Sequence, residues 1–313
     1  MDAISRLLRM ARVMATLDRR CLLGGGTRMD VSQRGGLEAQ FHILLEGECQ
    51  IQVGSTLLKM KPGDLALIPN GSPHRVITPG GIPSLGTTES AGDAFVTTRS
   101  DGGGAPVIDL FCGHYTFDAG AGAVLFRSLP DPVHVSFGDS ADSDGVLRML
   151  SALMRGEAQQ EGSGTAAILS ALSTVLLALV LRSSADSTTK PALWTAASDE
   201  RIAGVVEDIL LNPAEDWTIE RLSRSAAMSR ATFLRHFGRQ TGMTVGAFLA
   251  KVRVMTAAEL LSSSDATVAS VAWEVGYQSE SAFSRAFRAE VGTTPARFRR
   301  DQQRRVHGGS STR

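Results

Sequence analysis

The sequence predicts an α+β protein, with a β-rich N-terminal domain followed by helical segments and an all-helical C-terminal domain. Two observations support this prediction. Short β-rich runs separated by Gly, Pro and Asn turns occupy residues 20–137, and two similar helical segments recur near the C-terminus. At 313 residues the chain is long enough for two or three domains, each with its own core.

Charge is unevenly distributed along the chain. Residues 1–199 carry 16 Lys and Arg against 20 Asp and Glu, whereas residues 200–313 carry 16 against 12. This asymmetry predicts that only the basic second part binds a polyanion.

Cysteine content and the N-terminus indicate the compartment. The cysteines are Cys21, Cys49 and Cys112, and such a sparse, odd set favours a reducing environment over a disulfide framework. The first 20 residues, MDAISRLLRMARVMATLDRR, lack the uninterrupted apolar core of a secretory signal. We therefore expect a cytoplasmic protein.

The predicted N-terminal domain covers residues 1–140. A short amphipathic helix through Ile4, Leu7 and Leu8 opens it. Runs such as FHILLEGECQIQV (41–53) and TLLKMKPGDLALIP (56–69) then predict a sandwich or small barrel. The Gly-, Ser- and Thr-rich residues 78–106 predict a long mobile loop.

A helical pattern follows in residues 141–182. Its apolar run, AAILSALSTVLLALVL (166–181), is too short and too rich in Ser, Thr and Ala to span a bilayer comfortably. We expect a buried helix or one face of a homodimer, and no membrane partner. Residues 183–198 have the composition of a linker, residues 199–305 are helical, and residues 306–313 form a disordered tail.

A repeat at an offset of 50 residues is the strongest signal in the chain. SRATFLRHFGRQTGMT (229–244) matches SESAFSRAFRAEVGTT (279–294). Each copy has a serine at an N-cap position, two phenylalanines at i and i+4 for a buried stripe, and a glycine for a left-handed C-cap. Arg235 and Arg285 lie between the phenylalanines, off the buried stripe, and are free to contact a partner.

Another short helix precedes each copy, TIERLSRSAA before the first and TVASVAWEVG before the second. This is the helix-turn-helix arrangement, whose second helix enters the DNA major groove. VGAFLAKVRVMTAAELLSS joins the copies as a helix of roughly 27 Å, which suits successive groove segments about 34 Å apart. An all-helical interaction domain with a duplicated core is the alternative.

These segments, and VGYQSESAFSRAFR above all, resemble the DNA-binding domain of the AraC/XylS family over residues 199–300. The resemblance implies a regulator, usually an activator, whose partners are promoter DNA and RNA polymerase. It also implies the positions that face DNA. These are Ser229, Arg230, Ala231, Thr232, Arg235 and Arg239 in the first unit, and Ser279, Ser281, Ala282, Arg285 and Arg288 in the second.

The arginines have different expected roles. The forked guanidinium groups of Arg235 and Arg285 suit guanine edges, at roughly 1–3 kcal/mol of discrimination each. Arg230, Arg239 and Arg288 are expected to meet phosphates, which gives affinity without sequence choice.

The N-terminal domain resembles a cupin. GDLALIPNGSPH (63–74) has the spacing of the second cupin motif, and the first motif is partial, because Leu44 replaces its second histidine. His42, Glu48 and His74 could hold a divalent metal. We favour the alternative that the two histidines form hydrogen bonds with backbone groups, so that the barrel needs no cofactor, is a sensor, and is no enzyme.

The N-terminal domain also resembles a subgroup of these regulators that includes a reactive-chlorine-responsive activator. That resemblance implies a reversible disulfide between Cys21 and Cys112. We expect Cys21 to be the better exposed thiol, with Arg19 and Arg20 lowering its pKa, and His114 to stabilise a thiolate of Cys112. Cys49 has no such neighbours and is expected to fill the barrel.

Three hypotheses remain open. The chain is an activator that senses an oxidant through its cysteines, a regulator that binds a small molecule or metal in the barrel, or a metal-dependent cupin enzyme fused to a DNA-binding domain. All three cysteines could also be small core residues.

Overall fold

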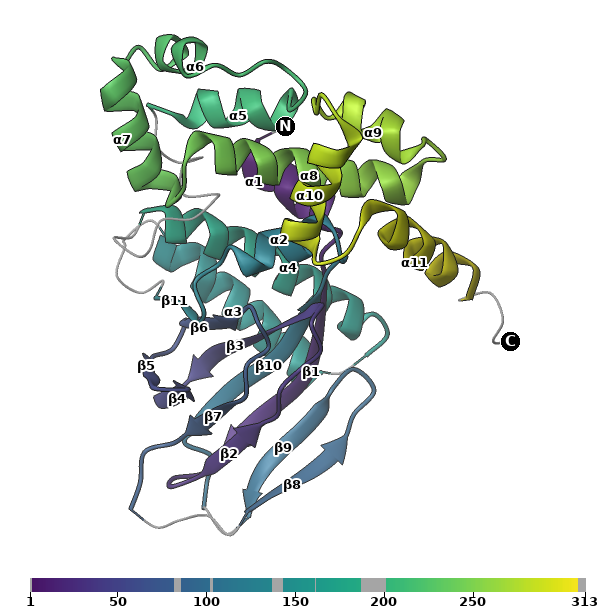
Figure 1. The fold of residues 1–313 in the computed structure, drawn as a ribbon. Helices are drawn as coiled ribbons and strands as arrows, with labels where there is room; N and C mark the ends of the chain where they lie inside the picture. Colours follow the sequence, from purple (N-terminus) through teal and green to yellow (C-terminus); the bar gives the residue numbers. More distant parts are fainter. Residues whose placement is uncertain are drawn as a thin grey trace. The chain divides into compact units, whose positions relative to one another are not determined.

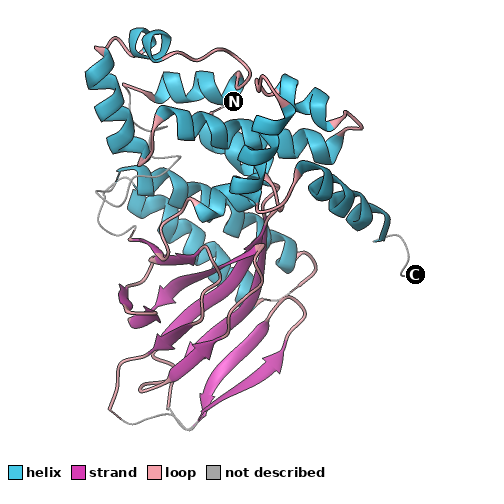
Figure 2. Cartoon of the chain, in the orientation of Figure 1, coloured by secondary structure: helices cyan, strands magenta, loops and turns pink. Residues whose placement is uncertain are grey.

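The computed structural model describes residues 2–81, 86–101, 104–136, 143–160, 162–186 and 201–308 (Figure 1). The chain forms two compact units. The β-rich unit comprises Val13–Phe117 and Leu129–Val180. The helical unit comprises Met1–Arg12, Asp118–Ser128 and Leu181–Arg313. The predicted α+β class is confirmed, and Figure 2 shows how strands and helices are distributed.

Two sheets form the β-rich unit. A seven-stranded sheet has the order β11-β6-β3-β10-β1-β9-β8, and a four-stranded sheet has the order β2-β7-β4-β5. The strands are β1 (Met14–Leu23), β2 (Arg28–Val31), β3 (Glu38–Glu46), β4 (Cys49–Val53), β5 (Thr56–Met60), β6 (Leu65–Ile68), β7 (His74–Ile77), β8 (Gly86–Ala91), β9 (Val96–Asp101), β10 (Ile108–Thr116) and β11 (Val133–Val135).

Alternation along the strands gives the large sheet two buried faces, because successive side chains point to opposite sides. One face supplies Leu23, Leu44 and Leu110 to a core shared with Ile51 and Val76 of the small sheet. Cys21, Cys49 and Cys112 belong to this core.

Helices α3 (Ser143–Gln159) and α4 (Thr165–Asp186) occupy the segment where the sequence predicts helices, and hydrogen bonds join both to the seven-stranded sheet. The Tyr115 hydroxyl of β10 donates to the Ser173 carbonyl of α4 at 2.8 Å. The Arg20 guanidinium of β1 donates to the Ala158 carbonyl of α3 at 3.3 Å. The stretch Thr165–Arg182 is long and apolar enough to cross a membrane by length and composition, and 39% of it is buried in a single chain.

The long loop predicted at residues 78–106 is wrong for residues 86–101. Residues 86–101 form a hairpin of β8 and β9, and β9 pairs with β1 in parallel, with Thr98 opposite Cys21. Threonine has a high β propensity, which favours strands here. The prediction missed them because the segment has few of the large apolar side chains that usually indicate a buried sheet. Residues 82–85 and 102–103 of the predicted loop lie outside the described residues.

The helical unit holds the remaining helices. These are α1 (Ala3–Ala11), α2 (Ala121–Arg127), α5 (Ala203–Leu211), α6 (Ile219–Ser225), α7 (Arg230–Thr241), α8 (Val245–Ser263), α9 (Val268–Glu274), α10 (Glu280–Val291) and α11 (Pro295–Gly308). Helix α8 is the continuous connection predicted between the two repeats.

Helices α1 and α2 lie in the helical unit although the sequence places them in the N-terminal domain. Both pack against α8. The fit around Gly120, at the start of α2, is close: a Cβ there would lie 2.3 Å from the Ala258 Cβ of α8 and 3.1 Å from the Phe298 ring of α11. The amphipathic pattern of α1 predicts a helix but not the surface that it covers.

The boundaries of two predicted segments differ from the structure. Residues 183–186 extend α4, and residues 187–198 of the predicted linker lie outside the described residues. Helix α11 continues to Gly308, into the predicted tail, and residues 309–313 are outside the described residues.

Candidate functional site

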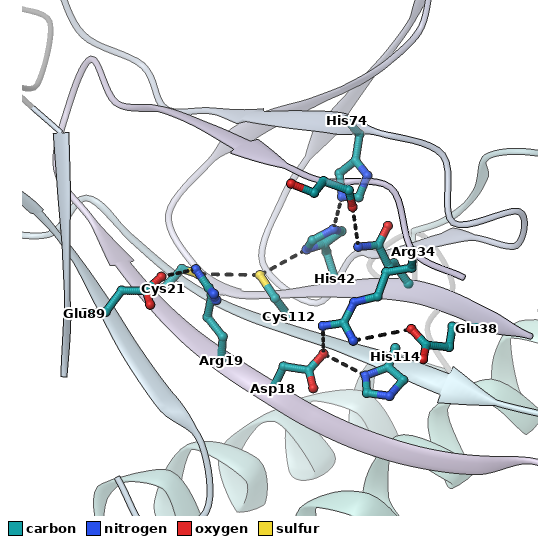
Figure 3. A network of polar contacts seen from close by, with 12 residues as sticks. Asp18, Arg19, Cys21, Arg34, Glu38, His42, His74, Glu89, Cys112 and His114 are labelled. Carbon is teal, nitrogen blue, oxygen red and sulfur yellow. Dashed lines mark hydrogen bonds and ion pairs between the residues drawn. The ribbon is translucent and has the colours of Figure 1, made fainter. Parts of the chain in front are cut away.

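Cys21 and Cys112 lie next to each other inside the β-rich unit (Figure 3). Their strands, β1 and β10, pair antiparallel, with Cys21 opposite Leu110, so Cys112 is the diagonal neighbour of Cys21. The two Sγ atoms are 3.6 Å apart. A disulfide bond is about 2.05 Å long, so bond formation must bring the two sulfurs together by roughly 1.5 Å.

The expected exposure of Cys21 is wrong. Cys21 is 0% exposed and Cys112 is 8% exposed. The guanidinium of Arg20 forms a paired ion contact with the buried carboxylate of Asp109, at 2.8 and 3.0 Å. Arg19 pairs with Glu89 of β8. The inward position of Cys21 follows from strand alternation between the two buried sheets.

A second contact of Cys112 involves His42 of β3. The two residues are register partners, and His42 Nδ1 lies 3.1 Å from the Cys112 Sγ. On the other side of the ring, His42 Nε2 lies 2.6 Å from His74 Nε2 of β7, and His74 Nδ1 lies 2.8 Å from the Ser72 carbonyl oxygen. We name Cys21, Cys112, His42 and His74 the sulfur–histidine cluster.

The direction of these hydrogen bonds follows from the Ser72 carbonyl, which can only accept. His74 Nδ1 must therefore carry a proton, and neutral His74 then accepts at Nε2. His42 donates from Nε2 and accepts at Nδ1, so the Cys112 thiol is the donor to His42.

Burial keeps the two histidines and the Cys112 thiol uncharged. It lowers the pKa of His42 well below its usual value, and the neighbouring His74 lowers it further. Burial also lowers the pKa of His74. The Cys21 sulfur, and then burial, raise the pKa of the Cys112 thiol, while the charge of Arg19 lowers it. Neutral His42 thus has a free lone pair at Nδ1 that accepts the hydrogen bond of the Cys112 thiol, although its lowered pKa makes it a weaker base than an exposed histidine.

Cys49 has a different environment. It is buried in the core, as expected for a residue that fills the barrel. Burial, with smaller contributions from Asp64 and Cys21, raises the pKa of its thiol to about 12. No histidine contact accompanies Cys49 in the described part of the chain, so its thiolate is strongly disfavoured.

The expected contact between His114 and Cys112 is wrong. His114 Nδ1 lies 2.8 Å from the carboxylate of Asp18, which also pairs with Arg34 at 2.9 Å. His42 takes the place expected of His114, because a cross-strand partner is closer to the sulfur than a residue further along the same strand.

The predicted metal set is not assembled. Glu48 is exposed and lines a separate surface pocket with Cys49 and Lys59. Two nitrogens bound to one zinc ion at about 2.0–2.1 Å would lie roughly 3.3 Å apart, so His42 and His74 at 2.6 Å are placed to share a proton instead. Among the described residues, no group of three His, Cys, Asp or Glu side chains could hold a metal ion. The favoured alternative is correct for His74, which contacts a backbone carbonyl.

The two helix-turn-helix units have the local structure that the repeat predicts. Ser229 caps α7 and Ser279 caps α10, each accepting a backbone hydrogen bond three residues on. Gly242 and Gly292 end these helices in the left-handed conformation. The phenylalanine pairs are buried, with ring centroids 5.6 Å apart in both units; they are Phe233–Phe237 and Phe283–Phe287.

The predicted DNA-facing side chains lie mostly on the surface. Ala231, Thr232, Arg235, Arg239, Ser281, Arg285 and Arg288 are exposed, and Ala282 is half-buried. Within the described ranges no carboxylate pairs with Arg235 or Arg285. Arg230 instead pairs with Glu220 of α6 at 2.7 Å, and Arg239 contacts His236 at 3.2 Å.

The link from Cys112 to His42 and His74 was missed by inference from sequence. Alternation along FHILLEGE places His42 on the same face as Leu44, which indicates an inward side chain. The partner of that side chain depends on the strand register, which no short motif contains.

Two family patterns match the chain. Residues 2–186 match the cupin family, and residues 222–301 match a helix-turn-helix domain. The match to the cupin pattern covers more than half of the 313 residues.

Whole-length relatives are similar to the chain over both units. An uncharacterised HTH-type transcriptional regulator of Haemophilus influenzae is 31% identical over 301 residues, covering 96% of this chain and 99% of the relative. The HTH-type transcriptional regulator MtrA of Neisseria gonorrhoeae is 27% identical, covering 96% and 99%. The RCS-specific HTH-type transcriptional activator RclR of Escherichia coli is 27% identical, covering 96% and 97%.

Proposed function

Because this chain belongs to the AraC family of helix-turn-helix transcriptional regulators and carries a cupin domain, we propose that it is a cytoplasmic activator that senses oxidants through Cys21 and Cys112. That it is a DNA-binding transcriptional regulator follows from the family. The proposal concerns the signal and its transmission.

The distance of 3.6 Å between the Cys21 and Cys112 sulfurs supports the proposal most directly. An oxidant of the hypochlorous acid class converts one thiol to a sulfenyl chloride, and the second thiol displaces chloride. The balanced reaction takes two thiols and one HOCl to one disulfide, one water and one HCl. The two cysteines are diagonal neighbours on paired strands, so we expect closing the bond to alter how β1 pairs with β10.

Chain continuity offers a route from this shift to the DNA-binding helices. Strand β1 follows α1 after Arg12 and Val13, and β10 leads into α2 through residues 117–120. Both helices pack against α8, which joins the two helix-turn-helix units. A change in the pairing of β1 and β10 would thus act on both helices that cover α8.

We also propose that α3 and α4 form a homodimer face, and that the DNA-bound protein recruits RNA polymerase. The support for the dimer is a set of large apolar side chains exposed on the two helices: Met149, Leu153, Ile168 and Val175. Large apolar side chains exposed together in one patch are typical of surfaces that another protein covers, and a dimer would need these four to form such a patch.

Brief exposure of the full-length protein to hypochlorous acid, followed by non-reducing intact mass measurement and peptide mapping, tests the signal. We expect the loss of two hydrogens and one linked peptide pair, Cys21 with Cys112. The Cys49→Ala variant is the matched control and should form the same link. Thiols that stay reduced, or that oxidise indiscriminately, would contradict the proposal and favour a small molecule in the barrel.

A further inference from the structure

We propose that Cys112 is the thiol that the oxidant attacks, in a small polar pocket, and that His42 accepts its proton while His74 serves as the next acceptor. Cys21 then reacts second, as the thiol that resolves the intermediate. This inference rests on the proposed function and assigns the order of events and the residues that carry it.

Access distinguishes the two cysteines. A pocket of about 230 Å³ opens beside β1, β2 and β10, and Cys112 and His42 line it. Cys21 does not line this pocket and is fully buried, with its Sγ atom 3.9 Å from the Met29 sulfur. A small molecule that enters this pocket therefore meets Cys112 before Cys21.

The pocket wall is suited to a small polar oxidant. Gln40 is 4% exposed and lines the pocket, and its Oε1 atom has no hydrogen-bond partner among the described residues. Its Nε2 group donates to the Ser32 carbonyl at 3.2 Å, which fixes the orientation of the amide. This oxygen is buried, so the O–H group of hypochlorous acid or the N–H group of a chloramine would satisfy it only by entering between the residues of the pocket wall.

Charges around the pocket are balanced. Arg19 and Arg34 line it, and so do Asp18 and Asp30. Asp18 pairs with Arg34, and Asp30 pairs with Arg75. These pairs leave little net charge at the entrance, so the pocket favours a neutral oxidant over a highly charged one.

The proton of Cys112 has a defined route. The thiol donates to His42 Nδ1, and His42 donates from Nε2 to His74, so transfer of the thiol proton can accompany transfer of the second proton to His74. His74 lines a further pocket with Pro73 and Arg75, which opens to solvent. Figure 3 shows this sequence of contacts from Cys21 to His74.

The chemistry balances in two steps. In the first, the Cys112 sulfur displaces hydroxide from the chlorine of HOCl; the thiol proton, held by the histidines, neutralises that hydroxide to water. In the second, the Cys21 sulfur attacks the Cys112 sulfur, chloride leaves, and the Cys21 proton passes to the same acceptor. Two thiols are oxidised and one chlorine is reduced to chloride.

Variants that each lack one of the two cysteines test the order of attack. Full-length Cys21→Ser and Cys112→Ser proteins are mixed with hypochlorous acid or neutral monochloramine for a series of times, and the remaining thiols are alkylated after denaturation and mapped. We expect loss of Cys112 in the first variant at least tenfold faster than loss of Cys21 in the second. Equal rates, or faster loss of Cys21, would overturn the inference.

The histidine variants test the proton route. His42→Gln removes the acceptor of the thiol proton, whereas His74→Gln keeps an oxygen that can accept from His42 but cannot hold a proton. We expect at least tenfold slower disulfide formation with monochloramine in His42→Gln, and a smaller decrease in His74→Gln. Unchanged rates in both variants would exclude the route.

A pH profile separates this role from a structural one. The charged or titratable groups near Cys112 come from β1 (Asp18, Arg19, Cys21), β2 (Asp30), the segment before β3 (Arg34), β3 (His42), β4 (Cys49) and β7 (His74). Without His42, attack requires the free thiolate, so the rate of His42→Gln should rise about tenfold per pH unit. The wild-type rate should rise less steeply. Parallel profiles would contradict the proton route.

These outcomes are distinguishable from failure of the proposed function. If the wild-type chain forms no Cys21–Cys112 disulfide, oxidant sensing itself fails. If the disulfide forms but Cys21 reacts first, only the order of attack and the proton route fail.

Discussion

Ser229 and Ser279 cap equivalent helices of the two helix-turn-helix units but differ in their side-chain partners. Each hydroxyl oxygen accepts a backbone hydrogen bond at 3.2 Å, from Thr232 and Ala282 respectively. The Ser229 hydroxyl also donates to the Thr232 hydroxyl at 2.9 Å, whereas the Ser279 and Ser281 hydroxyls lie 3.3 Å apart. A hydroxyl pair is thus hydrogen-bonded in each unit, with a threonine in the first and a serine in the second, so the two units differ at the positions predicted to face DNA.

Arg285→Ala and Arg235→Ala should each weaken binding to a selected duplex by about 1–3 kcal/mol and relax base preference at one position, because each exposed guanidinium suits a guanine edge. Fluorescence anisotropy with a duplex selected by the wild-type protein measures the effect. Arg288→Ala is the control, since a phosphate contact should weaken binding to all sequences alike and reduce its salt dependence. Wild-type affinity and specificity in Arg285→Ala would contradict the assignment.

The turns within the two units should respond in opposite ways to substitution. Ala227 follows α6 with φ 50°, a conformation that favours glycine, so Ala227→Gly should stabilise the protein by up to about 1 kcal/mol. Gly276 follows α9 with φ 89°, and a Cβ there would lie 2.8 Å from the Ala214 carbonyl. Gly276→Ala should therefore destabilise by more than about 1 kcal/mol. Urea denaturation measures both, and a shared direction of change would contradict this account.

Gly120→Ala should separate α2 from α8, because the added Cβ would meet Ala258 at 2.3 Å. We expect a loss of stability of about 1–3 kcal/mol from overpacking. Disulfide formation should persist, while the effect of oxidation on DNA affinity should decrease. Gly156→Ala is a suitable control, since no atom lies within 4 Å of its added Cβ. Full retention of the redox effect would show that α2 does not transmit it.

Asp118 should make stability depend on pH. Burial raises its pKa from 3.8 to about 6, although Gly122 N–H donates to one carboxylate oxygen at 2.6 Å. The folded chain then holds a proton between about pH 4 and 6 that the unfolded chain releases, so this contribution to stability falls as pH rises through that window.

Asp118→Asn keeps an acceptor for Gly122 and removes the charge. Above pH 6 it should stabilise the protein by about 1–3 kcal/mol relative to wild type, and the difference should disappear near pH 4. Chemical denaturation at several pH values tests this. A difference that is constant with pH would point to packing instead of charge.

The DNA-binding half could largely be predicted from sequence because its signals are local. Helix α7 contains all of its signals: the N-cap Ser229, the C-cap Gly242 and the buried phenylalanine pair. The start, end and buried face of the helix can therefore be predicted from a short stretch of sequence. The same holds for α8, whose length is apparent from an unbroken helical pattern.

The β-rich half was less predictable because its contacts depend on strand register. The neighbours of Cys112 are Cys21 and His42, which lie 91 and 70 residues away in the chain. The charged residues before Cys21 suggested exposure, but the strand turns Arg20 towards Asp109 and the cysteine towards the core. To place Cys21 and His42 beside Cys112, one must know that β10 lies between β1 and β3. The spacing of residues in the sequence does not identify these neighbouring strands.

The packing of α1 and α2 against α8 matters for how the protein is cut and labelled. A truncated fragment beginning near residue 201 would retain both helix-turn-helix units but lose the helices that cover part of α8, including the close fit between Gly120 and Ala258. Such a fragment would present newly bared apolar surface and could behave as an aggregating or constitutively altered protein. A fusion tag at Met1 would be attached next to α1 in the helical unit, so a purification tag is better placed elsewhere.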